Sequence, residues 1–261
     1  ELEAAYQTRL FDRQGSRISL TDSGKLLLEH CERILEDYKR LEYEMHLLHN
    51  EYTGGLKLGA STTIAQYVLP PLLASFIGKF PQVNLSLLNG NSREIEAALK
   101  EHRIDLGFVE GVFRLPNIKY TTFLEDELVA VVRTGSRLTV GEEITPEELL
   151  HLPLVLRERG SGTLDVFERA LQQHNIKLSS LQVLMYLGST ESIKLFLEHT
   201  DCLVIVSIRS ITRELYSGQL RVVEIKGMPM LRDFSFAQPQ GQESGLAQVF
   251  MQFAMHNNNK L

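Results

Sequence analysis

The feature that most constrains the fold of this chain is a narrow apolar stripe along residues 22–52. Its members are spaced alternately four and three residues apart, the heptad pattern of a helix that packs against another helix along one seam. Thr21 offers an N-cap oxygen before the first turn, and Gly54 and Gly55 follow the last turn. We therefore predict about 30 residues of helix, about 45 Å long. The predicted dimer interface consists of Leu27, Cys31, Ile34, Tyr38, Leu41, Met45 and Leu48. The alternative is a helix packed on its own chain, which usually has a wider apolar face.

Beyond Gly55 the sequence alternates short β-rich runs with helical runs. The first series predicts strands at 56–59, 83–88, 106–109 and 128–132, and helices at 64–79 and 92–102. The second series predicts strands at 154–156, 183–187 and 203–207, and helices at 163–174, 190–199 and 210–217. This alternation is typical of mostly parallel sheets with helices on both faces. We therefore predict an α/β fold with two Rossmann-like lobes.

The end of the chain contains more strands than the second series needs. Runs at 220–225 and 234–236 precede a predicted helix at 244–256, and we expect them to return to the first lobe. The polar stretches at 134–146 and around 218–219 would then be the two crossovers. This interpretation assigns residues 54–138 and 220–261 to lobe I and residues 142–217 to lobe II.

Charge and composition limit the partners of this chain. Its formal net charge is −6, and residues 1–50 carry seven Lys and Arg against ten Asp and Glu, a balance of 7 − 10 = −3. Nucleic-acid affinity comes mainly from basic side chains, so any DNA contact must rest on a few placed cations. No apolar run is long enough to span a membrane, and the first residues lack a secretory signal, so we expect a cytoplasmic protein. The two cysteines suggest neither a disulfide framework nor a zinc site.

Residues 10–24 predict a β-hairpin that leads into the long helix. Gly15 and Ser16 form the turn, and Arg13 and Arg17 flank it. Two arginines at these positions can straddle a phosphate backbone. They are equally compatible with an ordinary surface hairpin.

These residues resemble the LysR-type bacterial transcription regulators. The family carries Leu-Phe-x-Arg, found here as Leu10 to Arg13, then Arg-x-x-Leu-Thr-x-x-Gly, found here as Arg17 to Gly24, and then a long helix. Further matches are Leu2-Glu3, Val68-Leu69-Pro70 and Arg157-Glu158-x-Gly160-Ser161-Gly162-Thr163. Residues 59–64 and 109–111 look most like regulators of sulfur assimilation and of carbon fixation.

The resemblance implies an order of domains and a set of partners. Residues 1–21 would be the last part of a winged helix-turn-helix, residues 22–53 a dimerising linker helix, and residues 54–261 a two-lobed sensor like the periplasmic binding proteins. The first part of the helix-turn-helix would precede residue 1. Double-stranded DNA would be one partner, and the chain would associate as a homodimer or homotetramer. The predicted DNA contacts are Arg13, Ser16, Arg17 and Thr21.

Three predicted strand-to-helix junctions carry hydroxyl groups and glycines, at 59–63, 158–163 and 187–192. Such junctions present unpaired backbone N–H groups to an anion, and ligands in open α/β sheets bind at the carboxyl ends of strands. For any single junction, plain N-capping is the simpler interpretation. The three together predict a cleft site lined by Ser61, Thr62, Thr63, Ser161, Thr163 and Ser189.

Two charged residues end predicted strands near the same cleft. Glu110 could meet an amine or remain a solvated strand-end charge. Arg157 could hold a carboxylate or phosphate with two hydrogen bonds, or it could pair with an acid such as Glu158 or Asp165. Both residues are included in the predicted ligand site.

Evidence for catalysis is thin, because no histidine pairs with a nucleophile in a known pattern and no GxSxG or GxGxxG motif occurs. We expect no enzyme, no metal and no cofactor other than a small-molecule co-inducer. The sequence predicts a DNA-binding regulator whose sensor binds a small anionic or zwitterionic metabolite. The alternative is a periplasmic-type solute-binding protein, which has the same two-lobed architecture and no use for a wing and a heptad helix.

Overall fold

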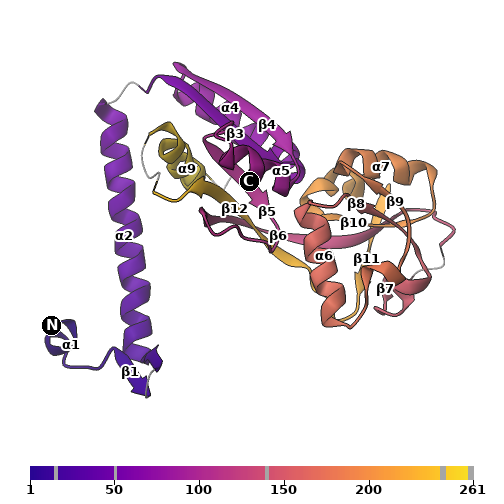
Figure 1. Ribbon diagram of the computed structural model, residues 1–261, viewed down its shortest axis with the longest axis horizontal. Coiled ribbons are helices and arrows are strands. Elements are labelled where there is room, and N and C mark those ends of the chain that lie inside the picture. The colour runs from indigo at the N-terminus through magenta and orange to yellow at the C-terminus, as the bar shows by residue number, and fades with distance from the viewer. Residues whose placement is uncertain (15–16, 50–51, 139–140, 242–244, 258–261) are drawn as a thin grey trace. The chain divides into compact units, whose positions relative to one another are not determined.

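The computed structural model describes residues 1–14, 17–49, 52–138, 141–241 and 245–257 (Figure 1). It divides into two units, residues 1–51 and residues 52–261. Within the described ranges, no helix is long and apolar enough to cross a membrane.

The first unit is a hairpin followed by one long helix. β1 pairs antiparallel with β2, with Phe11 opposite Leu20 and Gln14 opposite Arg17. The predicted hairpin and the predicted long helix are both present. The elements are α1 (Leu2–Ala5), β1 (Phe11–Gln14), β2 (Arg17–Leu20) and α2 (Asp22–His49).

The start of α2 is fixed by two residues of the Leu-Thr-x-x-Gly motif. The Thr21 hydroxyl accepts the N–H of Gly24 at 3.0 Å and donates to the carbonyl of Arg9 at 2.6 Å. A Cβ on Gly24 would lie 2.1 Å from the carbonyl oxygen of Leu10. Only glycine therefore allows the first turn of α2 to approach the backbone before the hairpin.

The second unit is built on a ten-stranded sheet. Its strands are β3 (Gly54–Ser61), β4 (Val83–Gly90), β5 (Leu106–Glu110), β6 (Ile118–Arg133), β7 (Glu143–Ile144), β8 (Pro153–Arg157), β9 (Gln182–Leu187), β10 (Leu203–Ser207), β11 (Leu220–Ile225) and β12 (Leu231–Pro239). Its α-helices are α3 (Thr62–Tyr67), α4 (Leu69–Lys79), α5 (Ser92–Lys100), α6 (Gly162–Gln173), α7 (Thr190–His199), α8 (Thr212–Tyr216) and α9 (Leu246–Asn257). Short 3₁₀ helices are η1 (Glu148–His151), η2 (Leu178–Ser180) and η3 (Ile208–Ser210).

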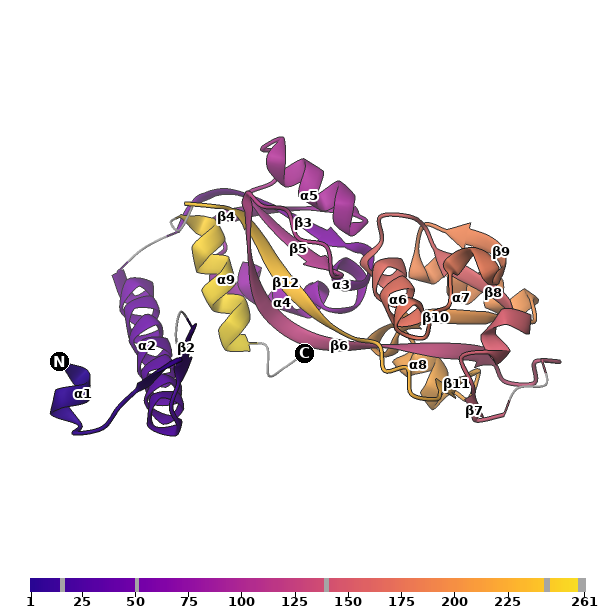
Figure 2. The same ribbon diagram turned by 60° about the horizontal axis from the view of Figure 1, so that its bottom comes forward.

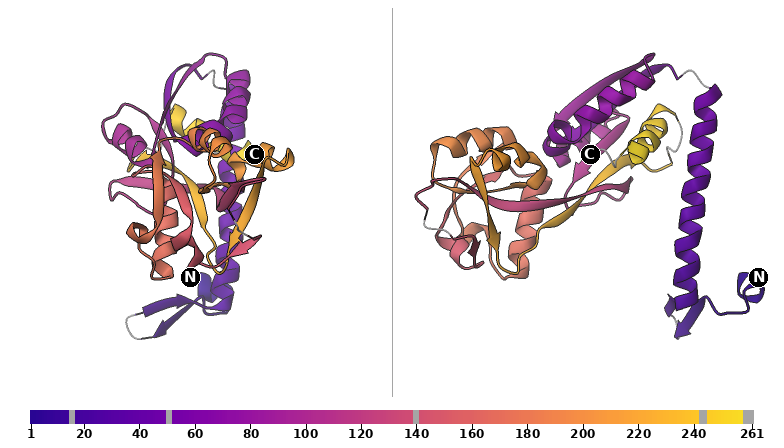
Figure 3. Two further views of the ribbon diagram at one scale, coloured as in Figure 1. Left: turned by 90° about the vertical axis from the view of Figure 1, so that its right-hand side faces the viewer. Right: turned by 180° about the vertical axis from the view of Figure 1, so that it is seen from behind.

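The sheet forms two lobes that share one strand. The first lobe has the order β4-β3-β5-β12-β6, and the second continues as β6-β10-β8-β9, with β11 also paired to β6 and β7 paired to β11. Figures 2 and 3 show β6 and β12 running between the lobes. β3 is parallel to β4 and β5, and β8 is parallel to β9 and β10, as the βαβ alternation predicts.

The predicted lobe boundaries differ from the structure at both crossovers. β11 pairs with β6 through Leu220 opposite Arg133, and β10 pairs with β6 through Ser207 opposite Leu128. Residues 128–133 and 220–225 therefore belong to the sheet of the second lobe, not to lobe I. The crossovers lie inside β6 and between β11 and β12. The chain passes from one lobe to the other within the continuous strand β6, so the polar stretches at 134–146 and 218–219 are not the crossovers.

The first sensor helix is also divided where one helix was predicted. α3 ends at Tyr67 and α4 begins at Leu69, with Pro70 and Pro71 in its first turn. Proline has no N–H to continue the hydrogen bonds of a helix, but it is accepted in a first turn. The break at Val68 therefore follows from the two prolines.

Apolar cores on both faces of the sheet hold the strand ends in place. In the first lobe, Phe76 of α4 packs against Phe250 and Phe253 of α9, and Phe108, Phe123 and Phe236 pack together on the sheet. In the second lobe, separate apolar clusters form under α6 and under α7.

Candidate ligand-binding site between the lobes

The three predicted hydroxyl junctions do not all have the same role. Ser161 caps α6 by accepting the N–H of Leu164, and Ser189 caps α7 by accepting the N–H of Ser192, each at 3.1 Å. Plain capping thus accounts for these two hydroxyls. Within the described chain, the Ser61 hydroxyl does not cap α3 but donates to Glu110.

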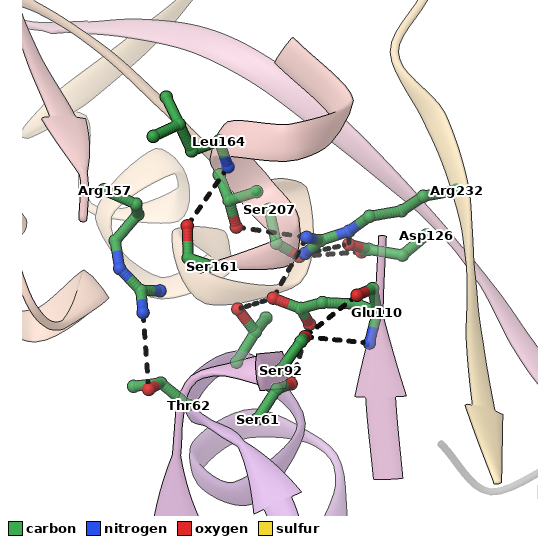
Figure 4. Close-up of polar contacts among 12 residues, drawn as sticks. Ser61, Thr62, Ser92, Glu110, Asp126, Arg157, Ser161, Leu164, Ser207 and Arg232 are labelled. Atoms are coloured by element: carbon green, nitrogen blue, oxygen red, sulfur yellow. Dashed lines mark hydrogen bonds and ion pairs between the residues drawn. The ribbon is translucent and has the colours of Figure 1, made fainter. Parts of the chain in front are cut away.

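Glu110, the last residue of β5, is the centre of a buried polar cluster (Figure 4). Its carboxylate accepts the Ser61 hydroxyl at 2.9 Å and the Thr63 hydroxyl at 3.3 Å. Its backbone carbonyl accepts the Ser92 hydroxyl at 2.9 Å. The Glu110 side chain is 2% exposed, so the solvated alternative from the sequence is wrong.

The cation that balances Glu110 is Arg232, which the sequence analysis missed. Its Nη1 lies 3.1 Å from Glu110 Oε1, and its Nε donates to Asp126 Oδ2 at 2.7 Å. Nη2 is also 2.7 Å from Asp126 Oδ2, in ion-pair contact without hydrogen-bond geometry. Asp126 further accepts the Ser207 hydroxyl at 2.7 Å. A buried guanidinium therefore holds two buried carboxylates. The pairing of β12 with β6 places Asp126 opposite Arg232, and the pairing of β12 with β5 places Glu110 nearby.

The second lobe closes on this cluster through the first turn of α6. Thr163 accepts a hydrogen bond from Arg232 Nη1 at 3.0 Å. A Cβ on Gly162 would lie 2.3 Å from the carbonyl oxygen of Glu110. The two lobes thus meet at Glu110. We call the residues Ser61, Thr63, Glu110, Asp126, Thr163 and Arg232 the Glu110 cluster.

Arg157, at the end of β8, forms a second buried cationic group. Its guanidinium binds Glu158 through Nε at 2.8 Å and Nη2 at 3.1 Å, the pairing that the sequence left open. Nη2 also reaches the Thr62 hydroxyl of the first lobe at 3.4 Å. The Thr62 hydroxyl in turn donates to the carbonyl of Gly90. Arg157 therefore spans the lobes beside the Glu110 cluster.

A cavity of about 640 Å³ opens next to the cluster. Gly111 contributes to its wall, and the charged residues of the lining are of both signs: Arg114, Arg169, Arg209 and Arg232 with Glu125, Asp126, Glu127 and Asp233. The predicted hydroxyls Ser61, Thr63 and Thr163 are almost fully buried behind it. In the described chain, no group of three or more His, Cys, Asp or Glu side chains is placed to hold a metal ion. The donors present are hydroxyl and guanidinium groups, which suit an anionic ligand.

The predicted DNA contacts can be placed only in part. Ser16 and the side chains of Arg13 and Arg17 lie outside the described residues, while the Thr21 hydroxyl caps α2. In the predicted dimer interface, Ile34, Tyr38, Leu41 and Met45 are exposed, Leu27 and Cys31 are half-buried, and the side chain of Leu48 lies outside the described residues.

Comparisons with known proteins agree on one class. The family model of the LysR substrate binding domain matches residues 49–258. The regulator YeiE of Escherichia coli K12 is 34% identical over 225 residues, covering 86% of this chain and 74% of that protein. The RuBisCO operon transcriptional regulator of Acidithiobacillus ferrooxidans is 30% identical over 97% of this chain and 81% of that protein. The regulator CysL of Bacillus subtilis is 26% identical, covering 90% and 78%.

Solved structures show the same fold. The regulatory domain of CcmR from Synechocystis PCC6803 has a TM-score of 0.70 and 26% identity, covering 78% of this chain and 97% of that chain. CrgA from Neisseria meningitidis, a LysR-type regulator, has a TM-score of 0.70 at 18% identity, covering 98% and 86%.

The fold and these matches define a two-lobed effector-binding domain with Rossmann-like subdomains. The chain belongs to the LysR-type transcriptional regulators. It is a DNA-binding regulator, and the solute-binding alternative is set aside. The predicted likeness to regulators of sulfur assimilation and carbon fixation is confirmed, since CysL and RuBisCO operon regulators are among the relatives.

Proposed function

We propose that the Glu110 cluster is the effector site of this regulator and that the effector is a small anionic or zwitterionic metabolite. One observation carries the proposal: hydroxyls of the first lobe and a guanidinium converge on a single buried carboxylate, Glu110, against which the second lobe closes. Groups that stabilise a carboxylate out of water also stabilise the anionic group of a ligand. The CcmR regulatory domain, one of the similar structures, was solved in complex with 2-PG.

In this mechanism the ligand anion takes the place of the Glu110 carboxylate. Ser61 and Thr63 would donate to it from the first lobe, Thr163 from the second, and Arg232 would supply the charge. Because the ligand then bridges the lobes, it favours their closed arrangement over an open one. The shift in this equilibrium would change how the oligomer presents its DNA-binding ends. The chain acts by binding, and we assign it no catalytic step.

The remaining residues of the predicted site would support this contact. Arg157 and Thr62 join the lobes beside the bound anion. Ser161 and Ser189 fix the first turns of α6 and α7 by capping them.

We further propose that α2 joins two copies of the chain, as a homodimer or within a homotetramer. In one chain, the side chains of Ile34, Tyr38 and Leu41 are each more than half exposed along one stripe. Burial of such a stripe against a second helix stabilises a coiled coil. DNA would be held through Arg13, Ser16 and Arg17 of the hairpin, and Thr21 would fix its position on α2. Such a regulator acts in the bacterial cytoplasm, where its operator is.

Calorimetric titration of the chain with sulfate, phosphate, O-acetylserine and phosphoglycerate tests the effector site. Thr163→Val keeps the volume but removes a hydroxyl that would bind the anion. A hydrogen bond to a charged group contributes about 1.5 to 3 kcal/mol, so affinity should fall about 10- to 150-fold. Thr62→Val should weaken binding through Arg157, and Thr212→Val, at an exposed position of α8, is the matched control. A ligand that binds the parent and both site variants equally would place the effector elsewhere.

A further inference from the structure

A second contact between the lobes uses none of the residues of the Glu110 cluster. Tyr67, the last residue of α3, donates a hydrogen bond from its phenol to the carboxylate of Glu191 in the first turn of α7. Tyr67 reaches this position because α3 ends there. α4, which has Pro70 and Pro71 in its first turn, begins two residues later at Leu69. The other end of α3 carries Thr62 and Thr63. One short helix therefore connects this contact to the candidate effector site.

The acceptor of this hydrogen bond is held in place from behind by Lys194. The Lys194 ammonium lies 2.9 Å from Glu191 Oε1 and 2.7 Å from Glu214 Oε1 of α8, and it donates to the carbonyl of Ser210 at 3.1 Å. It also lies 5.4 Å from the centre of the Tyr67 ring. At this distance a cation is attracted to the face of an aromatic ring. The second lobe thus presents a fixed carboxylate and a cation to the same tyrosine.

The charge states at neutral pH favour the contact. Burial and the hydrogen bond to Glu191 raise the pKa of the Tyr67 hydroxyl, so it remains a protonated donor. Burial would raise the pKa of Glu191, but the hydrogen bonds from Tyr67 and Lys194 outweigh it and lower that pKa. The bond therefore joins a neutral donor to an ionised acceptor, which is stronger than a bond between neutral groups.

We propose that Tyr67, Glu191, Lys194 and Glu214 form an interlobe latch, and that Tyr67 is a positioning residue for effector binding. The latch holds the second lobe against α3 and so keeps Thr62 within reach of Arg157. Its effect on effector affinity rests on the proposed function, whereas its effect on the closure of the lobes does not. Without the Tyr67 hydroxyl, the open arrangement becomes more populated. Part of the binding free energy of the effector is then needed to close the lobes, so its apparent affinity falls.

Distances between spin labels on the two lobes of the full chain test the latch directly. Labels are placed by Lys100→Cys on α5 and Tyr216→Cys on α8, two exposed positions, in a Cys31→Ser background. Cys202 is buried and does not compete for the label. Dilution with unlabelled chain restricts the measurement to distances within one chain.

Tyr67→Phe keeps the ring and removes only the hydroxyl. The Tyr67 hydroxyl donates to a charged group, so the ratio of open to closed chains should rise about 10- to 150-fold, seen as a longer component of the distance distribution. Glu191→Gln keeps an acceptor oxygen and should cause a smaller change than Glu191→Ala.

The matched control is Tyr120→Phe. Tyr120 donates to Glu96 at 2.5 Å, and burial together with this bond raises the pKa of its hydroxyl, but both residues lie in the first lobe. The Tyr120→Phe variant therefore loses the same kind of hydrogen bond without changing any contact of the second lobe. The distances between its spin labels should equal those of the parent. Identical distributions for Tyr67→Phe and the parent, or an equal change in Tyr120→Phe, would overturn the latch.

Sulfate affinity of the same variants separates the latch from the effector site. If both proposals hold, Tyr67→Phe weakens sulfate binding by the factor by which the closed fraction of the chains falls, while Tyr120→Phe does not. Opened lobes with unchanged sulfate affinity would support the latch and contradict the Glu110 site. Weaker sulfate binding without any change in the distances would contradict the latch.

Discussion

Replacing Arg232 by methionine removes the cation on which the buried cluster depends. The Arg232 side chain is 1% exposed, and it contacts Asp126 at 2.7 Å, Glu110 at 3.1 Å and Thr163 at 3.0 Å. Methionine preserves most of the volume, so the main loss is electrostatic. Both carboxylates are 2% exposed or less. Without Arg232, Glu110 would keep the Ser61 and Thr63 hydroxyls, and Asp126 would keep the Ser207 hydroxyl and Arg209, whose Nε lies 3.7 Å away.

The expected cost follows from that geometry. Breaking a buried ion pair by removing one partner costs about 3 to 5 kcal/mol, because the other charge remains out of water. A domain of this size loses about 2 to 4 °C of melting temperature per kcal/mol, so the midpoint should fall by about 6 to 20 °C. Thermal unfolding followed by circular dichroism measures this change.

Two comparisons make the prediction refutable. Arg103→Met removes an arginine from an exposed pair with Glu101, which should cost less than about 1 kcal/mol. Adding Glu110→Gln and Asp126→Asn to Arg232→Met removes the stranded charges and should recover most of the lost stability. If Arg232→Met costs no more than Arg103→Met, or if the triple variant is no more stable than the single one, the cluster is not held by charge pairing.

Substitutions elsewhere separate the roles of the other parts of the chain. Glu110→Gln removes the carboxylate that competes with a ligand anion and should raise sulfate affinity about tenfold in calorimetry, since like charges repel strongly out of water. Gly162→Ala places a Cβ 2.3 Å from a backbone oxygen, so the lobes must separate and small-angle scattering should give a larger radius. Ile34→Asp with Leu41→Asp puts charges on the exposed stripe of α2 and should remove one association step in sedimentation. Burial raises the pKa of the Cys202 thiol to about 11, so alkylation at pH 8 should spare Cys202 until the chain unfolds, as mass spectrometry would show.

The elements that the sequence predicted well are those with a local signal. The heptad stripe, the caps of α6 and α7, and the apolar strands β3, β8 and β10 all follow from residues near one another in the chain. Only the last part of β6 was predicted, as the strand at 128–132. Its first ten residues include Lys119, Glu125, Asp126 and Glu127, and a run with so many charged residues does not have the apolar pattern of a buried strand. The misplaced lobe boundaries follow from the same omission, since β6 is the strand that joins the lobes.

In the candidate site too, the residues with a signal in the neighbouring sequence were predicted, and those brought together only by strand pairing were not. Ser61, Thr63 and Glu110 end strands or begin helices, so the rule that ligands bind at the carboxyl ends of strands predicted them. Arg232 and Asp126 lie inside strands and are 106 positions apart. They meet only because β12 and β6 pair in one register, with Arg232 opposite Asp126. The residues near Arg232 and near Asp126 in the sequence do not indicate how the two strands pair.

The burial of Arg232 gives a reason why the proposed anion site contains an acid of its own. A guanidinium buried without a counter-charge would strongly destabilise the unliganded fold, and Arg232 is buried, so water solvates it little. Asp126 and Glu110 supply that counter-charge, and Arg157 has Glu158 for the same purpose. Of the two acids on Arg232, Glu110 is the one that also accepts the hydroxyls of Ser61 and Thr63. In the proposed mechanism its carboxylate is exchanged for a ligand while Asp126 keeps Arg232 in place. The sequence left open whether Glu110 meets an amine of the ligand or stays solvated, whereas in the proposed mechanism it is the group with which the ligand competes.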